Sequence, residues 1–127
     1  MSRLFAFAFA LCALGACQKP LDARLQAGDT AARAGKWDLA RTRWAEATQL
    51  DPHSAVAFAK LGVAQWELGL KDDAAASWSS AVSIDPNAED AVAALARLDL
   101  ARHDAGAAVA RLQFVPAPVT PAFQMVL

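Results

Sequence analysis

The sequence has almost no excess of charge of either sign. Its 127 residues include 12 Lys and Arg against 13 Asp and Glu, a formal net charge of −1 at pH 7. A mature chain without residues 1–16 would also lose Arg3, and its balance would be 11 − 13 = −2. Nucleic-acid-binding domains usually carry a clear positive excess, so this composition gives no electrostatic reason to expect a nucleic-acid partner.

The residues that most enzymes use for catalysis are also scarce. The sequence has no tyrosine, no glycine-rich phosphate loop and no serine in a nucleophile elbow. The two histidines, His53 and His103, fall in predicted turns with no second ligand at metal-binding spacing. Four serines, Ser77, Ser79, Ser80 and Ser83, are interpreted as a solvent-exposed cluster on one helix. We therefore expect no enzyme, cofactor, metal ion or small-molecule substrate.

The amino-terminal apolar run is too short to cross a membrane. It extends from Leu4 to Leu14 and as a helix would be roughly 16 Å long, about half the hydrocarbon thickness of a bilayer. One basic residue, Arg3, precedes it and small residues follow it, an arrangement typical of a secretory signal peptide. An ordinary cleaved signal and a buried first helix are the alternatives to the lipidated form described next.

The end of this run resembles the bacterial lipobox. In Leu14-Gly15-Ala16-Cys17 a small residue precedes the cysteine, and the resemblance implies that residues 1–16 are a lipoprotein signal peptide and that Cys17 is acylated. Residues 17–20 would then be the acylated cysteine and a tether. Cys12 would be lost with the signal, so no internal disulfide is expected. By resemblance to enterobacterial lipoproteins, Gln18 in place of Asp implies the outer membrane, facing the periplasm.

A repeat of 34 residues organises the remainder of the chain. A shift of 34 aligns Gly28 with Gly62, Trp44 with Trp78 and the Asp51-Pro52 pair with Asp85-Pro86. A period of 34 built from two helices is typical of tetratricopeptide arrays. Further matches lie at Gly35 and Gly69, Asp38 and Asp72, Ala40 and Ala74, and Ala47 and Ala81.

Within each unit the apolar and small residues recur at three- and four-residue steps, which predicts two helices. We expect helices over 55–68, 71–84 and 89–102. Gly69 should end the first of these in the left-handed conformation, and His103 should serve the corresponding turn of the third unit. Asp85 or Asn87 is expected to accept the free N–H groups of the helix that follows.

The pattern Leu61-Gly62, Gly69, Ala74, Trp78, Ala81 and Asp85-Pro86 resembles the tetratricopeptide repeat (TPR) consensus. The resemblance implies an all-α fold, an α-solenoid of about three helix-turn-helix repeats after the signal segment. The TPR domain would cover 21–115, with repeats over 21–54, 55–88 and 89–115. Pro116 should cut the last helix short. The Pro-rich apolar tail, 116–127, either caps the last pair or docks elsewhere.

Four tryptophans divide into two roles. Trp37, Trp44 and Trp78 fall where the repeat requires core bulk, whereas Trp66 stands at a place that lines the concave groove in this family. The resemblance places thirteen residues on the groove face: Asp22, Leu25, Asp29, Arg33, Val56, Ala59, Val63, Trp66, Glu67, Asp90, Ala93, Arg97 and Leu100. Alternatively, Trp66 only covers a neighbouring helix. A buried aromatic anchor ringed by polar groups is typical of an interaction hot spot.

These features together predict a non-enzymatic, membrane-anchored scaffold that binds a partner protein in its groove. Family members that clamp a carboxylate terminus carry Lys and Asn where this chain has Leu25, Asp29, Ala59 and Val63, so we expect an apolar or amphipathic partner segment instead. By analogy with small lipoproteins, the partner would belong to a pilus, secretion or outer-membrane complex. The alternative is a self-assembling periplasmic subunit whose groove holds its own tail or a second copy.

Overall fold

The computed structural model describes residues 20–113, and within that range the chain is helical with no β-strand. A helix occupies residues 20–33, and five more follow: α2 (Trp37–Leu50), α3 (Ala55–Glu67), α4 (Lys71–Ile84), α5 (Glu89–Ala101) and α6 (Ala105–Leu112). The proposed signal peptide 1–16, the acylation site Cys17 and the tail 116–127 lie outside the described residues. None of the described helices is long and apolar enough to cross a membrane.

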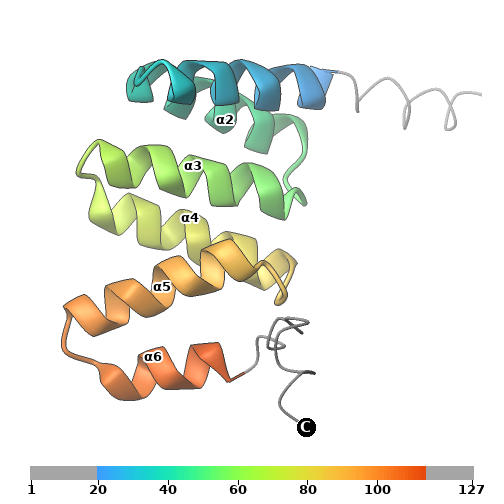
Figure 1. Ribbon diagram of the computed structural model, residues 1–127. Coiled ribbons are helices and arrows are strands. Elements are labelled where there is room, and N and C mark those ends of the chain that lie inside the picture. The colour runs from blue at the N-terminus through green and yellow to red at the C-terminus, as the bar shows by residue number, and fades with distance from the viewer. Residues whose placement is uncertain (1–19, 114–127) are drawn as a thin grey trace, which may run out of the picture.

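The helices form antiparallel pairs that stack one on the next. Figure 1 shows the helix over 20–33 with α2 at one end of the stack, α3 with α4 in the middle, and α5 with α6 at the other end. The prediction of an all-α solenoid of about three helix pairs is confirmed. The first helix already includes Pro20, which the sequence analysis placed in the tether.

All three turns inside the helix pairs use one left-handed residue, as expected. Gly35 has φ +71°, Gly69 has φ +79° and His103 has φ +62°. In the middle pair the Gly69 N–H donates to the Trp66 carbonyl, and the next N–H, of Leu70, donates to the Gln65 carbonyl at 2.8 Å. The same two bonds recur around Gly35 and His103. This Schellman pattern satisfies the last carbonyl groups of each first helix.

The turns between pairs differ in detail from the prediction. The Asp85 carboxylate accepts the Asn87 N–H at 2.9 Å, and Asp51 accepts the His53 N–H in the same way. Neither bond reaches a helical N–H, and the N-cap of α5 is Ala88, which has no side-chain acceptor. The expectation that Asp85 or Asn87 caps α5 is therefore wrong, because Asp85 is used to close its own turn.

The packing of the first two pairs depends on a tryptophan that lies against a glycine. Trp44 and Trp78 are 3% and 5% exposed. A Cβ on Gly28 would come within 2.7 Å of Cε2 of Trp44, and one on Gly62 within 2.8 Å of Cε2 of Trp78. Since real Cβ atoms essentially never approach so closely, only glycine fits at either place. The prediction that bulky indoles pack on small residues is confirmed for these two pairs.

Each of these indoles also makes a hydrogen bond to the helix that it covers. Nε1 of Trp44 donates to the Leu25 carbonyl at 3.3 Å, and Nε1 of Trp78 donates to the Ala59 carbonyl at 3.1 Å. Both partners lie 19 residues earlier in the chain. The buried N–H groups are thereby satisfied, and the same contact is built twice, one repeat apart.

Of two further predicted environments, that of Trp37 is right only in part and that of Ser77 is wrong. Trp37, which the repeat pattern placed in the core, is only half-buried and lies against the edge of the cluster formed by Ala31, Ala40 and Trp44. Ser77, which the sequence analysis placed on the surface, is buried and donates its hydroxyl hydrogen bond to Oε1 of Gln65 at 2.6 Å. Ser77 was expected on the surface because serine is polar. A serine hydroxyl can nevertheless be buried when it has a hydrogen-bond partner.

The third pair is smaller and more open. Helix α6 has 8 residues against 14 in α2 and α4, and Ala108 is its one buried residue. Val109 and Leu112 of α6 are both about half exposed. The prediction that the last helix is short is confirmed, although Pro116 itself lies outside the described residues.

Candidate partner-binding groove

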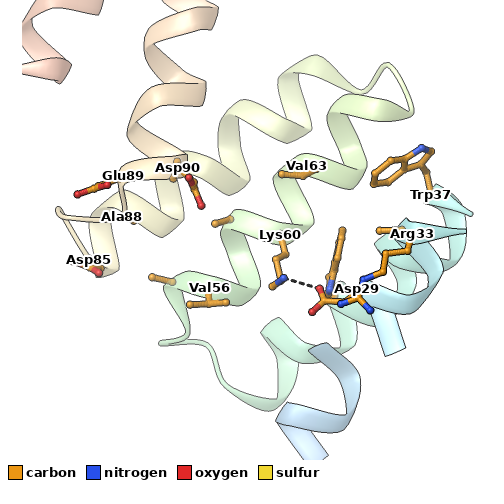
Figure 2. A pocket seen from close by; sticks show the side chains of 15 residues that line it. Asp29, Arg33, Trp37, Val56, Lys60, Val63, Asp85, Ala88, Glu89 and Asp90 are labelled. Atoms are coloured by element: carbon orange, nitrogen blue, oxygen red, sulfur yellow. Dashed lines mark hydrogen bonds and ion pairs between the residues drawn. The ribbon is translucent and has the colours of Figure 1, made fainter. Parts of the chain in front are cut away.

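A cavity of about 550 Å³ lies across the first helices of the three pairs (Figure 2). Residues of the helix over 20–33 and of α2 form one end, α3 forms the middle, and the α4–α5 turn with the start of α5 forms the other end. The lining residues are Asp29, Ala32, Arg33, Trp37, Trp44, Ala55, Val56, Ala59, Lys60, Val63, Asp85, Ala88, Glu89, Asp90 and Ala91.

A second cavity, of about 410 Å³, continues the first along α3 and α5. The two cavities share Val63 and Asp90. The residues that line the second are Val63, Trp66, Glu67, Trp78, Asp90, Ala93, Ala94 and Arg97. We call the continuous surface formed by the two cavities the groove. Its existence follows from the helix stack, because three first helices present their outer faces side by side.

Most of the residues that the resemblance placed on the groove face do line it. Ten of the thirteen are found in the two cavities: Asp29, Arg33, Val56, Ala59, Val63, Trp66, Glu67, Asp90, Ala93 and Arg97. The helix stack therefore brings together residues that lie up to two repeats apart in the sequence. Their role in binding stays a prediction.

Three residues of the predicted set line neither of these cavities. Leu25 is partly buried and packs against the cluster that contains Trp44. Its carbonyl receives the indole hydrogen bond of that tryptophan. Leu100 is exposed near the end of α5, and Asp22 is exposed on the first helix. For Leu25 the physical reason is that the indole draws this turn of the helix into the core.

Several lining residues lie outside the predicted set, among them Lys60 and Trp37. Lys60 stands four residues after Val56 and three before Val63, so the helical period places all three on one face. This spacing in the sequence could have predicted that Lys60 lines the groove. Trp37 was assigned to the core because the repeat requires a bulky residue at its position. It stands at the start of α2, and there it lines the end of the groove.

The apolar part of the groove is carried by α3. Val56, Val63 and Trp66 are among the exposed large apolar residues of the chain, and all three face the groove. The Trp66 ring lies 6.0 Å from that of Trp78, tilted by 41°. The Nζ atom of Lys71 lies 5.6 Å from the Trp66 centroid. These two contacts hold the indole in place, so a ligand would meet a preorganised aromatic surface.

The charged residues of the groove are unevenly placed. In the middle, Nζ of Lys60 lies 2.6 Å from Oδ1 of Asp29 and 5.5 Å from the Trp44 centroid. At the α5 end, Asp85, Glu89 and Asp90 form no ion pair within residues 20–113. Figure 2 shows these three carboxylates on one side of α3 and Arg33 with Trp37 on the other.

The groove contains no candidate metal centre within the described residues. Among the described residues no three His, Cys, Asp or Glu side chains are placed to hold a metal ion. His53 and His103 are exposed, and neither lines one of the two cavities. The arrangement is suited to contact with another molecule through an apolar face and flanking charges.

No protein-family model matches this sequence, and no curated protein matches it either. Solved structures do. The second TPR domain of Spaghetti (RPAP3), which was solved bound to the HSP90 peptide SRMEEVD, superposes with a TM-score of 0.69 at 16% identity, over 78% of this chain and 94% of that one.

Two structures of MamA are also similar. A mutant form of MamA has a TM-score of 0.62 at 24% identity, and the match covers 73% of this chain and 68% of that one. MamA of AMB-1 has a TM-score of 0.65 at 21% identity, over 84% of this chain and 60% of that one. Helix pairs, a 34-residue period and these similarities agree: the chain has the tetratricopeptide-repeat fold.

Proposed function

We propose that this protein is a non-enzymatic interaction scaffold that binds a segment of a partner protein in its groove. The observation that carries the proposal is the exposed apolar surface of Val56, Val63 and Trp66 along the groove. Apolar residues that line a continuous hollow are typical of interaction sites, whereas singly scattered ones need no explanation. The similar RPAP3 domain, which was solved with a peptide, gives independent support.

The partner segment is apolar or amphipathic. The groove positions at which carboxylate-clamping TPR domains carry Lys and Asn hold Leu25, Asp29, Ala59 and Val63 here. One of these, Asp29, is itself a carboxylate and is already paired with Lys60. A helix or an extended strand that places apolar side chains on Val56, Val63 and Trp66 fits this surface better than an acidic terminus does.

We further propose that the scaffold is a bacterial lipoprotein, anchored in the outer membrane through acyl chains on Cys17 and facing the periplasm. The lipobox-like segment and Gln18 support this proposal. Two or more chains give stable anchoring, since each buried CH₂ contributes about 0.8 kcal/mol. The partner would then be a component of a pilus, a secretion channel or an outer-membrane complex.

Replacing Cys17 by Ser tests the anchor. The variant should remain unlipidated, which intact mass measurement detects, and it should no longer sediment with membranes. A lipid adduct that persists on the variant, or a wild-type protein without one, contradicts the anchor. Neither outcome bears on the groove.

A site-specific photocrosslink in cells tests the binding surface. We would place the crosslinking residue at Val63, in the shared part of the groove, and in a matched control at Leu39 of α2. The two side chains are 41% and 42% exposed, and Leu39 lines neither of the groove cavities. The proposal predicts a specific adduct with another protein at Val63 alone. Equal capture at both positions, or none at Val63, contradicts it.

The rival proposal is a self-assembling subunit whose groove holds its own tail, 116–127, or a second copy. In that case the Val63 crosslink would yield only the protein itself. Mass measurement on the purified chain separates the two proposals further. A dimer that becomes a monomer when residues 116–127 are deleted favours self-assembly, whereas a monomer in both forms favours partner recruitment.

A further inference from the structure

We propose that the groove selects partner segments that carry a lysine or arginine beside an apolar face, with the basic side chain placed at the α5 end. This inference rests on the proposed function, because it names the chemistry of the segment that the groove binds. It follows from which charges in the groove are already satisfied and which are not.

The middle of the groove presents an apolar surface with its charge neutralised. Lys60 is the one basic residue of α3, and its ammonium group is 2.6 Å from the Asp29 carboxylate and lies over the Trp44 ring. An incoming charged group would have to compete with this pair. Apolar side chains of a ligand, in contrast, can cover Val56 and Val63 without displacing any polar contact.

Where α5 begins, the groove carries carboxylates that form no ion pair within residues 20–113. Arg97, the cation of α5 in the groove, lies about two helical turns further along, in the second cavity. Glu89 and Asp90 are exposed and form no ion pair or side-chain hydrogen bond within residues 20–113. Asp85 accepts one backbone N–H and has further acceptor capacity. The first cavity has four carboxylates against two cations, so its formal balance is 2 − 4 = −2, more negative than the whole chain at −1.

Charge complementarity therefore defines the occupant. A cation on the ligand gains from three nearby carboxylates, while an acidic segment would meet the same carboxylates as repulsion. Arg33 stands at the opposite end of the groove, beyond α3, and it disfavours a ligand cation there. The basic residue is consequently expected beside α5, and the apolar residues over α3.

Selection from a random peptide library displayed on phage tests the inference with the full chain as target. We would run the selection on three proteins: the wild type, the groove variant E89Q/D90N and the control variant D72N/D73N. Asp72 and Asp73 occupy the first turn of α4, as Glu89 and Asp90 occupy that of α5, and they lie outside the groove. The control therefore loses the same charge and the same helix-dipole contribution. It also loses the Asp72–Arg102 ion pair, which is exposed and contributes little to stability.

Peptides selected on the wild type and on D72N/D73N should combine apolar residues with Lys or Arg, and this enrichment should disappear on E89Q/D90N. A synthetic copy of a wild-type peptide should bind E89Q/D90N about threefold to tenfold more weakly than wild type, with a smaller ratio at high salt. Peptides without basic enrichment, or an enrichment unchanged by E89Q/D90N, would overturn the inference while leaving the proposed function intact. Selection of no groove-dependent peptide at all would overturn the proposed function itself.

Discussion

In the first two helix pairs the two helices pack on each other through a different central contact from that in the third pair. In the first two, a buried tryptophan lies against a glycine and its indole N–H reaches the facing helix. In the third, the 34-residue register puts Ala96 at the glycine place and Leu112 at the tryptophan place. Leu112 is 48% exposed where Trp78 is 5% exposed. The repeat is therefore retained in its turns and helix order, while its central contact is present only twice within the described residues.

This difference determines which part of the groove rests on a well-packed core. Its apolar surface lies on α3. Buried residues of α3 belong to the core cluster of Trp44, partly buried ones pack against the cluster of Trp78, and Trp66 itself contacts Trp78. The third pair contributes mainly the charged end, through Glu89, Asp90 and Arg97. We infer that the first two helix pairs fix the shape of the groove. The more open third pair then adds charged side chains at one end of it.

The largest difference in stability between the pairs is expected when the residue at the tryptophan position of the repeat is replaced by alanine. Trp78→Ala should lower the free energy of unfolding by roughly 3 to 5 kcal/mol, because it removes a large buried side chain and leaves a cavity. Leu112→Ala should cost under about 1 kcal/mol, since half of that side chain already faces water. Urea denaturation of both variants gives the comparison. Similar losses at the two sites would mean that the third pair is as tightly packed as the second.

The glycine place should show the next largest effect. Gly62→Ala is expected to destabilise the protein by about 1 to 3 kcal/mol, because the new methyl group overlaps the Trp78 ring. At the same register place in the third pair the natural residue is already alanine. Ala96→Gly should cost only about 1 kcal/mol, the ordinary difference in helix propensity. Thermal melting of the two variants suffices, and a stabilised Gly62→Ala protein would break the comparison.

The turn residues should give a smaller effect of opposite sign. His103 adopts the left-handed conformation that Gly69 adopts one repeat earlier. His103→Gly should therefore stabilise the protein by about 0.5 to 1 kcal/mol, since it relieves the steric cost of a side chain at positive φ. Gly69→His should cost about as much. The pair is measured by denaturant unfolding, and a destabilised His103→Gly variant would show that the imidazole has a role beyond the turn.

The smallest effect is expected at the ion pair in the groove. Lys60→Met should change the free energy of unfolding by less than about 1 kcal/mol, because both partners are about one-third exposed. Removal of the cation also leaves the Asp29 carboxylate unpaired and makes the groove more negative. The same variant should thus bind a basic peptide at least as well as wild type, which isothermal titration can check. A loss of binding would indicate that Lys60 contacts the ligand.

Much of the fold could be predicted because its determinants are local. Apolar spacing set the ends of α3 and α5 to within one residue: α3 ends at Glu67, not Leu68, and α5 at Ala101, not Arg102. In both cases the last expected residue is the C-cap, whose dihedral angles leave the helix. The left-handed turns followed from glycine and from the tolerance of histidine for that conformation.

The misplaced residues depend on contacts that periodicity does not describe. Ser77 is buried because Gln65 faces it, and no pattern in either helix predicts that hydrogen bond. Leu25 lies outside the groove because its turn of helix is tied to an indole 19 residues later. Asp85 closes a turn in preference to capping α5. Each of these outcomes was decided by a partner on another element or by competition for one acceptor.

The central claim is that a tryptophan ring packed against a glycine holds each of the first two helix pairs together, and a double-mutant cycle tests this claim most directly. The cycle would measure the free energy of unfolding for Gly62→Ala, Trp78→Leu and the double variant, which installs the alanine–leucine combination of the third pair. If the indole is what excludes a Cβ at position 62, Gly62→Ala destabilises the wild type but stabilises Trp78→Leu by up to about 1 kcal/mol. An equal loss in both backgrounds would contradict the account.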